Sequence, residues 1–265
     1  MTQPPIVLVH GWAGSPAAWR STRAAIAALA PDAVVRAVAL PGAHGALEAA
    51  TRSRVGPATI GGAVDAVVAV LEDLDAPGLV VGHSMGAQVT LLTQVRRPDL
   101  VAAEVVLDPA YASRASADDI ESWADRIERR GHAELEAFFS GALDPAIPRT
   151  DRETVLADFH ATPVPVIASY LRSEYSDPGA IGLREHTAPA ARRRTRPVLA
   201  IHSTAAGADA ERLLAAPPRS EIELWPGHCH FLHLQAPERT ARRALTWAAA
   251  LTGGPELVRG QHHRR

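Results

Sequence analysis

The stretch that decides the fold is Leu79-Val80-Val81-Gly82-His83-Ser84-Met85-Gly86, in which a short apolar run leads into a G-x-S-x-G motif and then into a helix pattern. In this setting the serine lies on a sharp, strained turn between a strand and a helix, with its hydroxyl held clear of the backbone. The flanking glycines let the strand and the helix approach each other closely. We therefore interpret Ser84 as a candidate nucleophile at a helix N-terminus rather than as part of a chance pentapeptide.

Short apolar runs alternate with longer helix-like segments on both sides of this motif. The runs predicted as strands are Ile6–Val9, Val34–Leu40, Leu79–Val81, Glu104–Leu107, Val198–Ile201 and Glu221–Trp225. The segments predicted as helices are Pro16–Ala30, Ile60–Leu74, Ser84 to the stop at Arg96-Arg97-Pro98, Asp209–Leu214 and Ala236–Leu251. Strands that alternate with helices predict an α/β fold with a mostly parallel sheet, helices on both faces, and functional groups at the carboxyl ends of the strands.

The alternation stops within residues 111–196, where no strand pattern is found. Two places there resemble capping boxes, Ser116 with Asp119 and Thr150 with Glu153, and each precedes apolar residues at helical spacing. We interpret this block as short helices inserted into the α/β chain. Most of its large apolar side chains would pack these helices and a minority would line a pocket. They are Trp123, Phe138, Phe139, Phe159, Ile167, Tyr170 and Leu171.

Two absences in the composition exclude whole classes of mechanism. The 265 residues include 27 basic ones, all of them arginine, and neither lysine nor asparagine occurs anywhere. Without lysine there is no Schiff-base chemistry, no pyridoxal phosphate anchor, and no P-loop or kinase lysine. Without asparagine there is no N-glycosylation acceptor and no kinase-type catalytic loop. Any chemistry must therefore use Ser, His, Asp, Glu, Arg, Tyr or backbone groups.

Charge and hydropathy give no indication of a nucleic-acid or membrane partner. The formal net charge is −2, and the densest basic cluster, Arg192-Arg193-Arg194 with Arg196, is typical of a solvated linker or helix end. No apolar run approaches the roughly 20 residues that cross a bilayer, and no signal-type segment is found at the N-terminus. The single cysteine, Cys229, excludes an intramolecular disulfide and a multi-thiolate zinc site. We expect a soluble, cytoplasmic protein.

A second motif, His10-Gly11-Trp12, follows the first predicted strand. Acyl transfer needs two N–H donors aimed at the point where the oxyanion forms. The amide of Met85, directly after the serine, would be one donor and the amide of Trp12 the other. Gly11 would let the loop turn close to the substrate. Taken alone, the motif is also compatible with an ordinary turn at a strand end.

Three histidines follow the last predicted strand, in Trp225-Pro226-Gly227-His228-Cys229-His230-Phe231-Leu232-His233. A serine nucleophile needs a general base, and histidine suits that task at neutral pH. The three histidines also suggest a metal site, alone or with Cys229, but no second cluster of ligands accompanies them. Cys229 itself is disfavoured as a nucleophile, because no elbow or helix N-terminus presents it.

These landmarks resemble the α/β-hydrolase family over nearly the whole chain, in the order nucleophile, acid, histidine. The matching residues are His10-Gly11, Leu40-Pro41-Gly42, Gly82 to Gly86, Asp108, and His230 before Pro237-Glu238. The resemblance implies a Ser–His–acid triad and a helical cap inserted after the strand that ends at Asp108. It also implies a sheet of about six strands, because the first two strands of the larger family sheet are missing.

The resemblance selects one histidine from the three. His230 stands at the family's usual distance before Pro237-Glu238, and the residues after it fall in register with the family's segment after its catalytic histidine. We therefore predict His230 as the base and keep His228 and His233 as alternatives.

The acid departs from the common family pattern, whose position falls here at Ala206. Asp108 directly follows the strand after the nucleophile strand, where some family members place their acid, and from there it could orient the histidine. We predict Asp108 as the acid and keep Asp209 as the alternative. Without a catalytic role, Asp108 would be a turn residue before Pro109 and Asp209 would be a helix cap.

We thus predict an α/β-hydrolase core of residues 1–110 and 196–252, a helical cap of residues 111–195 and a flexible tail of residues 253–265. The predicted function is a serine hydrolase that cleaves a carboxylic ester or lactone of a small to medium hydrophobic substrate through an acyl-enzyme, with no metal and no cofactor. The alternatives are C–C bond hydrolysis, lyase chemistry or cofactor-free dioxygenation on the same fold, and a ligand-binding protein without turnover. The oligomeric state is left open. The predicted site comprises Ser84, His230 and Asp108, with the amides of Trp12 and Met85 as the oxyanion hole.

Overall fold

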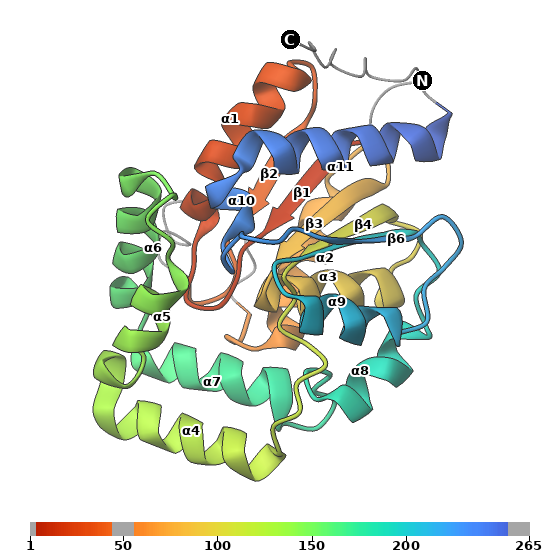
Figure 1. Cartoon of the computed structure of the whole chain (residues 1–265). Helices are drawn as coiled ribbons and strands as arrows, with labels where there is room; N and C mark the ends of the chain where they lie inside the picture. Colours follow the sequence, from red (N-terminus) through yellow and green to blue (C-terminus); the bar gives the residue numbers. More distant parts are fainter. Residues whose placement is uncertain (1–3, 44–55, 254–265) are drawn as a thin grey trace.

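The computed structural model describes residues 4–43 and 56–253, which form a six-stranded sheet covered by helices (Figure 1). The order across the sheet is β2-β1-β3-β4-β5-β6, and every adjacent pair is parallel. The predicted fold class and all six predicted strands are confirmed, with strand ends shifted by at most three residues. The strands are β1 (Ile6–Val9), β2 (Val35–Val38), β3 (Gly78–His83), β4 (Val101–Leu107), β5 (Val198–His202) and β6 (Glu221–Leu224).

The side chains of each strand explain its position in the sheet. β1, β3 and β5 are buried along their whole length, as strands covered on both faces should be. The two edge strands carry charge: Arg36 is exposed on β2, and Glu221 is exposed on β6. Charged side chains on an edge oppose pairing with another chain. The apolar strands therefore occupy the centre, where β3 leads into the nucleophile motif.

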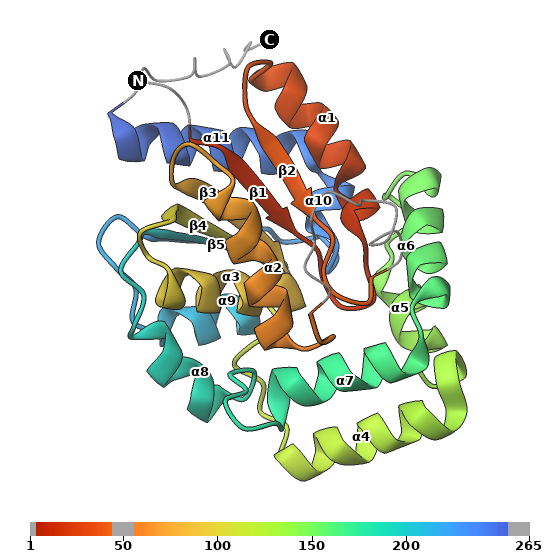
Figure 2. The same ribbon diagram turned by 180° about the vertical axis from the view of Figure 1, so that it is seen from behind.

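Helices cover both faces of the sheet, as Figures 1 and 2 show from opposite sides. Each layer contributes its own apolar cluster against the strands. The elements of one layer are η1 (Pro16–Trp19), α1 (Arg20–Leu29), α10 (Leu232–Gln235) and α11 (Pro237–Thr252). Those of the other layer are α2 (Ile60–Glu72), α3 (Met85–Arg96) and α9 (Ala205–Arg212).

The segment between β4 and β5 is helical, as predicted, and its strand-like pairing is limited to one isolated bridge between Ser113 and Leu183. The arrowheads of β1 and β2 point toward α5, α6 and α7 in both ribbon views, so these helices lie beyond the carboxyl ends of the strands. The elements of this segment, called the inserted helices below, are α4 (Ala117–Arg130), η2 (Gly131–Glu134), α5 (Glu136–Ala142), α6 (Arg149–Ala161), α7 (Val164–Tyr175) and α8 (Arg184–Ala191).

One of the two predicted capping boxes is confirmed. At the start of α4 the Asp119 amide donates to the Ser116 hydroxyl, and the Ser116 amide donates to the Asp119 carboxylate. The box predicted from Thr150 and Glu153 is wrong, because α6 begins one residue before Thr150 and no side chain caps it. Pro148, whose ring fixes its φ, precedes this helix and sets its start instead.

The prediction for the short helix after β5 is wrong in its start. α9 begins at Ala205, and the Thr204 hydroxyl accepts a hydrogen bond of 3.1 Å from the Gly207 amide. Asp209 therefore lies within the helix and is not its cap. The predicted tail lies outside the described residues except for Gly253, which ends α11 with a left-handed φ of +71°.

The basic cluster is solvated only in part. Arg192 and Arg193 are exposed near the end of α8, as expected, but Arg194 is buried. Its guanidinium lies 3.2 Å from the Glu104 carboxylate and 3.3 Å from the Glu211 carboxylate. A buried arginine requires such partners, and both lie far from it in the sequence, so the local pattern could not reveal them.

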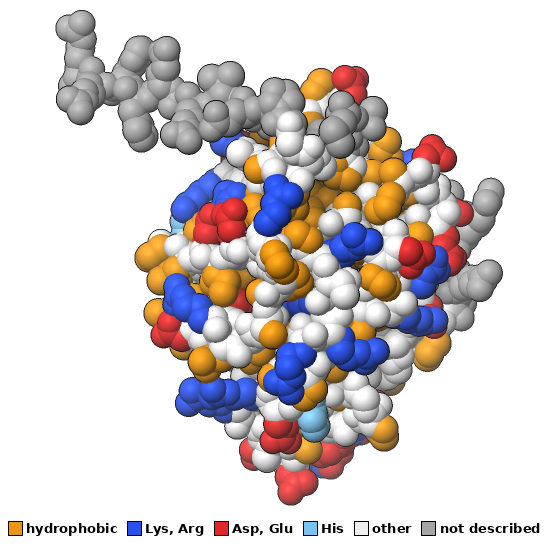
Figure 3. Space-filling view, turned by 90° about the vertical axis from the view of Figure 1, so that its right-hand side faces the viewer, with side chains coloured by type: hydrophobic (Ala, Val, Ile, Leu, Met, Phe, Trp, Pro, Cys, Tyr) orange, Lys and Arg blue, Asp and Glu red, His pale blue; other side chains and the backbone are white. Residues whose placement is uncertain are grey.

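The surface shows no single continuous patch of charge on the side drawn in Figure 3, where arginines are interspersed with acidic and hydrophobic side chains. This distribution follows from the near balance of basic and acidic residues. Across residues 4–43 and 56–253, no helix is both long enough and apolar enough to cross a membrane.

Glycines allow backbone segments to meet where β1 and β3 end. A Cβ on Gly82 would overlap the backbone of Gly86, and a Cβ on Gly86 would overlap the carbonyl oxygens of Val9 and His10. Only a residue without a side chain permits such an approach. The end of β1 is therefore held directly against the turn that carries Ser84.

We expect Gly86→Ala to lower the free energy of unfolding by about 3 kcal/mol or more, because its methyl group would overlap the backbone at the end of β1. Gly141→Ala is the matched control, since the space at Gly141 in α5 is open. There alanine should be neutral or should stabilise by up to about 1 kcal/mol. Denaturant unfolding followed by circular dichroism measures both variants. If Gly86→Ala proved as stable as Gly141→Ala, the close approach at Gly86 would be contradicted.

Candidate active site

Ser84 occupies the sharp turn between β3 and α3 that the sequence predicts. Its backbone has φ +54° and ψ −120°, a conformation that residues other than glycine seldom adopt. The Ser84 amide donates to the carbonyl of Leu107 at 3.1 Å, and the Ser84 carbonyl accepts from the amides of Ala87 and Ala110 at 3.0 and 3.2 Å. These bonds hold the strained turn in place. The side chain thus sits at the N-terminus of α3, where the helix dipole favours negative charge.

His230 donates a hydrogen bond of 2.7 Å from Nδ1 to the carboxylate of Asp108. Asp108 directly follows β4, and its carboxylate also accepts bonds of 2.9 Å from the amide and the hydroxyl of Ser203. Burial alone would raise the pKa of Asp108, but the hydrogen bonds from His230 and Ser203 outweigh it and hold the pKa below its usual value. Because Nδ1 carries the donated proton, Nε2 of His230 is left as a proton acceptor.

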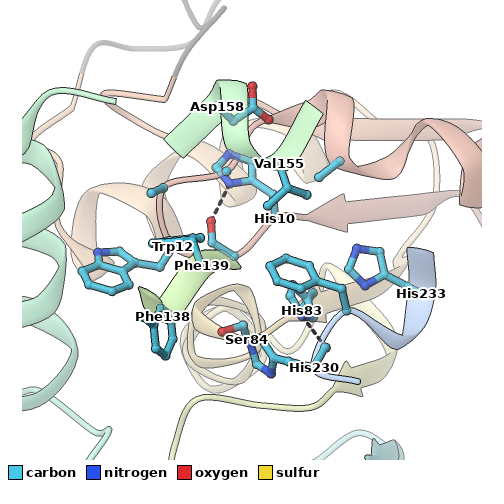
Figure 4. Close-up of a pocket in the computed structure, with 15 residues that line it drawn as sticks. His10, Trp12, His83, Ser84, Phe138, Phe139, Val155, Asp158, His230 and His233 are labelled. Atoms are coloured by element: carbon cyan, nitrogen blue, oxygen red, sulfur yellow. Dashed lines mark hydrogen bonds between the residues drawn. The ribbon is translucent and has the colours of Figure 1, made fainter. Parts of the chain in front are cut away.

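Ser84 and His230 line the same cavity, and Figure 4 shows the serine side chain beside the imidazole ring. Asp108 holds the Nδ1 atom of that ring from outside the cavity. The structure therefore brings the three predicted residues together in the order hydroxyl, imidazole, carboxylate. They come from the ends of β3 and β4 and from the loop after β6.

The two alternative bases are placed differently. His228 lies outside the cavity, with Nδ1 at 3.3 Å from the Pro226 carbonyl. His233 lines the cavity, but its ring is buried between those of Trp19 and His83, at centroid distances of 4.6 and 4.4 Å. None of the ion pairs in the described part of the chain includes His233. Neither alternative is therefore oriented by an acid as His230 is.

The alternative acid lies away from the histidines. Asp209 is exposed on α9, and its carboxylate pairs with Arg212 one turn later, at 2.5 Å. Ala206, at the common family position for the acid, lies in the first turn of the same helix and offers no carboxylate. Asp108 is the acid that the structure associates with His230.

The loop after β1 lies directly against the serine turn. A Cβ on Gly11 would lie 3.2 Å from the Cβ of Ser84 and 3.1 Å from Nδ1 of His83. His10 fixes this loop, because its Nδ1–H donates to the Gly11 carbonyl at 2.9 Å and its Nε2 accepts from the Leu40 amide at 3.3 Å. Burial lowers the pKa of His10 to about 4, so the ring stays neutral and keeps this donor–acceptor pattern.

Two backbone amides beside the serine are available to a ligand. Met85 is the first residue of α3, so its amide has no acceptor within the helix. Among the described residues, the backbone hydrogen bonds of turns and loops leave the Trp12 amide unused as well. Two such donors close to a nucleophile are what an oxyanion site requires.

His83 is a site residue to which the sequence analysis assigned no role. Its Nε2–H donates to the carbonyl of His230 at 2.9 Å, and its ring centroid lies 4.8 Å from that of His230 and 4.4 Å from that of His233. Burial, together with these two neighbouring histidines, holds the pKa of His83 well below its ordinary value. The neutral ring ties the histidine loop to the serine turn. In the sequence, the one indication of this role is that His83 directly precedes Ser84.

The cavity beside Ser84 is small, about 40 Å³, and largely apolar in its lining. At the end opposite Ser84, Figure 4 shows Asp158, whose carboxylate accepts a hydrogen bond of 2.6 Å from the Ser15 hydroxyl. The inserted helices contribute Phe138, Phe139, Val155 and Asp158 to the lining, and the rest of the chain contributes Trp12, Ala13, Ala18 and Phe231 with the residues described above.

Cys229 and its neighbouring histidines are not arranged as metal ligands. Within the described ranges, no three His, Cys, Asp or Glu side chains are grouped so that they could hold a metal ion. Burial raises the pKa of the Cys229 thiol, which disfavours the thiolate that a nucleophile needs. Ser84, by contrast, is presented on the strand-to-helix turn at the N-terminus of α3.

The fold and the site together define a class of protein. A serine on a strand-to-helix turn, a histidine bonded to a carboxylate at a neighbouring strand end, and helices inserted beyond the strand ends are features of α/β-hydrolase folds. The sequence agrees, because residues 6–243 match the alpha/beta hydrolase family. The chain belongs to that family.

Among characterised proteins, the chain is similar to lipase LipV of Mycobacterium tuberculosis, with 38% identity over 99 residues. The match covers 37% of this chain and 34% of the lipase, so it spans about a third of each.

Solved structures share the fold at low sequence identity. An esterase from Thermogutta terrifontis matches with a TM-score of 0.69 and 19% identity over 94% of this chain and 91% of that chain. A hydrolase from Oleispira antarctica matches with a TM-score of 0.72 and 15% identity over 92% of both chains. An E-2-(acetamidomethylene)succinate hydrolase matches with a TM-score of 0.65 and 19% identity over 96% of this chain and 92% of that chain.

Buried neutral histidines make the fold sensitive to acid. Burial lowers the pKa of His233 to about 3 and that of His10 to about 4, whereas an unfolded histidine has a pKa of about 6.5. Below that pH the unfolded chain binds protons that the folded chain does not. Stability that is present above about pH 6.5 is therefore lost as the pH falls toward the folded pKa values.

We expect His233→Phe to reduce the loss of unfolding free energy between about pH 7 and about pH 4 by about 3 kcal/mol, because the unfolded variant lacks that proton-binding group. His186→Phe is the control, since the His186 side chain is exposed. Urea unfolding at a series of pH values measures both. If the two variants lose stability in parallel, His233 is not held neutral by burial.

Proposed function

We propose that this chain is a serine hydrolase that cleaves a carboxylic ester or a lactone through an acyl-enzyme. The observation that carries the proposal is the 2.7 Å hydrogen bond from His230 to Asp108, beside a serine held in a strained turn at a helix N-terminus. This arrangement offers a nucleophile, a base and an acid that orients the base. The partial match to a lipase supports ester chemistry.

In the first half of the reaction, Ser84 Oγ attacks the carbonyl carbon while Nε2 of His230 takes the hydroxyl proton. The carbonyl oxygen becomes an oxyanion, which the amides of Trp12 and Met85 stabilise. The bond to the leaving oxygen then breaks, and His230 gives its proton to that oxygen. An alcohol is formed, and the acyl group stays on Ser84. Asp108 stabilises the imidazolium that exists between the two proton transfers.

In the second half, water replaces the alcohol as the attacking group. His230 takes a proton from the water, whose oxygen forms a bond to the acyl carbon. When this intermediate collapses, the bond to Ser84 breaks and the serine oxygen recovers a proton from His230. The net reaction consumes one water and yields a carboxylic acid and an alcohol, or one hydroxy acid from a lactone. No cofactor takes part.

We further propose that the inserted helices act as a cap on a core of residues 1–110 and 196–252. Phe138, Phe139 and Val155 from these helices line the cavity that Ser84 occupies. An apolar cavity that admits little water favours a small to medium hydrophobic group over a charged one. The partner expected from this lining is a small-molecule ester or lactone.

A fluorophosphonate probe should label the wild-type protein and leave Ser84→Ala unlabelled, because the probe forms its bond to the serine oxygen. Hydrolysis of p-nitrophenyl esters should fall by at least about 10³-fold in Ser84→Ala. Ser140→Ala is the control, since it removes an exposed hydroxyl that bonds to Glu136 within α5. Gel fluorescence and initial rates measure the two effects.

Unchanged ester turnover in Ser84→Ala would contradict a serine hydrolase. Labelling of Ser84 without turnover of any ester, lactone or thioester would instead favour C–C bond hydrolysis, lyase chemistry or dioxygenation on this fold. Stabilisation by a ligand without any turnover would favour a binding protein.

Asp108→Asn should lower kcat by about 10³- to 10⁴-fold, because an amide at this position no longer selects the useful tautomer of His230. Asp209→Asn should leave kcat unchanged, since Asp209 is exposed and pairs with Arg212. Steady-state kinetics on the best p-nitrophenyl ester compares the two carboxylates directly. Equal losses, or a loss confined to Asp209→Asn, would assign the acid elsewhere.

A further inference from the structure

The side chain of Trp12 is held by the inserted helices. Its indole Nε1–H donates to the carbonyl of Ile167 in α7 at 2.9 Å. Its ring lies against those of Trp123 on α4 and of Phe138 and Phe139 on α5, at centroid distances of 5.7, 6.2 and 6.0 Å. Figure 4 shows the ring pointing away from the serine turn. One residue therefore has its amide next to Gly11, which lies against Ser84, and its side chain among these helices.

One further hydrogen bond and one close polar contact join the same loop to the inserted helices. The Ser15 hydroxyl donates to the Asp158 carboxylate on α6 at 2.6 Å. The Thr162 hydroxyl, which follows α6, lies 3.5 Å from the Ala13 carbonyl and donates to the Asp158 carbonyl at 2.8 Å. Residues 10–15, called the oxyanion loop below, therefore contact this segment at Trp12, Ala13 and Ser15.

The oxyanion loop has a backbone that needs such support. Ala13 has φ +51°, in the left-handed region that residues with a Cβ seldom adopt. Such a conformation persists where surrounding contacts determine it. The direction of the Trp12 amide depends on this backbone, and an error of about 1 Å in the position of an active-site group can cost about 10²-fold in rate.

We propose that the Trp12 side chain is a positioning residue through which the inserted helices hold the oxyanion loop. The position of these helices over the site thus sets the direction of an oxyanion donor as well as excluding water. This inference rests on the proposed function, because it takes the Trp12 amide as a donor to the oxyanion. The Trp12 indole acts only through that amide and does not touch the reacting atoms.

The structure supplies a matched comparison. Tyr170, also on α7, donates from its hydroxyl to the Pro41 carbonyl at 2.9 Å. This bond has the same length and the same kind of acceptor as the bond from Trp12 to Ile167. It joins α7 to the loop after β2, which carries none of the proposed catalytic groups. Tyr170→Phe therefore weakens the attachment of α7 without removing a hydrogen bond to the oxyanion loop, because the bond from the Leu40 amide to His10 is kept.

The experiment compares Trp12→Phe with Tyr170→Phe. Phenylalanine at position 12 keeps the amide and an aromatic ring, but it loses the indole N–H and leaves the space of the five-membered ring unfilled. We expect Trp12→Phe to lower kcat for a p-nitrophenyl ester by about tenfold or more, with KM within about twofold. Affinity for an alkyl boronic acid, which forms a tetrahedral adduct with the serine, should fall by a similar factor. Tyr170→Phe should leave kcat and boronate affinity unchanged, although both variants lower the melting temperature.

Each other outcome overturns the inference. Wild-type kcat and boronate affinity in a folded Trp12→Phe would show that the indole bond does not position the donor. Equal losses of kcat in both variants would assign the effect to the attachment of α7 in general. Boronate binding that is the same in the wild type and in Ser84→Ala would reject the proposed function itself, and the inference with it.

Ser15→Ala supplies a second variant should Trp12→Phe not fold. It breaks the bond to Asp158 at the other end of the oxyanion loop. As for Trp12→Phe, we expect a lower kcat and weaker boronate binding but little change in KM. Unchanged kcat and boronate affinity in a folded Ser15→Ala would count against the inference equally.

Discussion

Gly86 allows the end of β1 to lie directly against the turn between β3 and α3, and Gly82 allows β3 and α3 to approach each other within that turn. A side chain at either position would overlap backbone atoms, so the constraint is steric and admits no larger residue. The whole site depends on this approach. It places the serine, the first amide of α3 and the loop after β1 beside one another, although they belong to separate segments of the chain. Gly11 extends the same contact, since a Cβ there would touch both His83 and Ser84.

Burial and hydrogen bonding then distinguish the histidines that line the cavity. His10, His83 and His233 are enclosed, and burial lowers their pKa values. His230 is the histidine in this group that donates to a carboxylate, within the described part of the chain. In the proposed mechanism a positive charge on His230 therefore has a fixed partner, whereas a charge on the other rings would be desolvated without one. This difference in burial and hydrogen bonding distinguishes His230 from the other histidines more firmly than its spacing in the sequence does.

Sequence patterns predicted what depends on local periodicity and strand order. The six strands, the inserted helices and the motif at Ser84 follow from apolar spacing and from glycines flanking a serine. The failures concern contacts that a local pattern does not contain. The sequence pattern predicts Asp209 as a helix cap, but Thr204 caps that helix. It also predicts a solvated Arg194, but Arg194 is buried beside Glu104 and Glu211. The prediction of Asp108 over Asp209 came from the family resemblance, and its contact with His230 depends on the folded sheet rather than on a local pattern.

Trp12 connects the local contacts at the serine turn with the long-range contacts of the inserted helices. Its amide belongs to the loop that the glycine contacts press against the serine, while its indole bonds to a helix inserted more than a hundred residues later. Backbone and side chain of one residue therefore face two different parts of the fold. An oxyanion donor works by being oriented before the reaction begins, so that no reorganisation is needed as charge develops. A loop with a left-handed alanine cannot supply that rigidity from its own sequence. The inserted helices supply it from outside, which makes the cover of the cavity a part of the catalytic geometry.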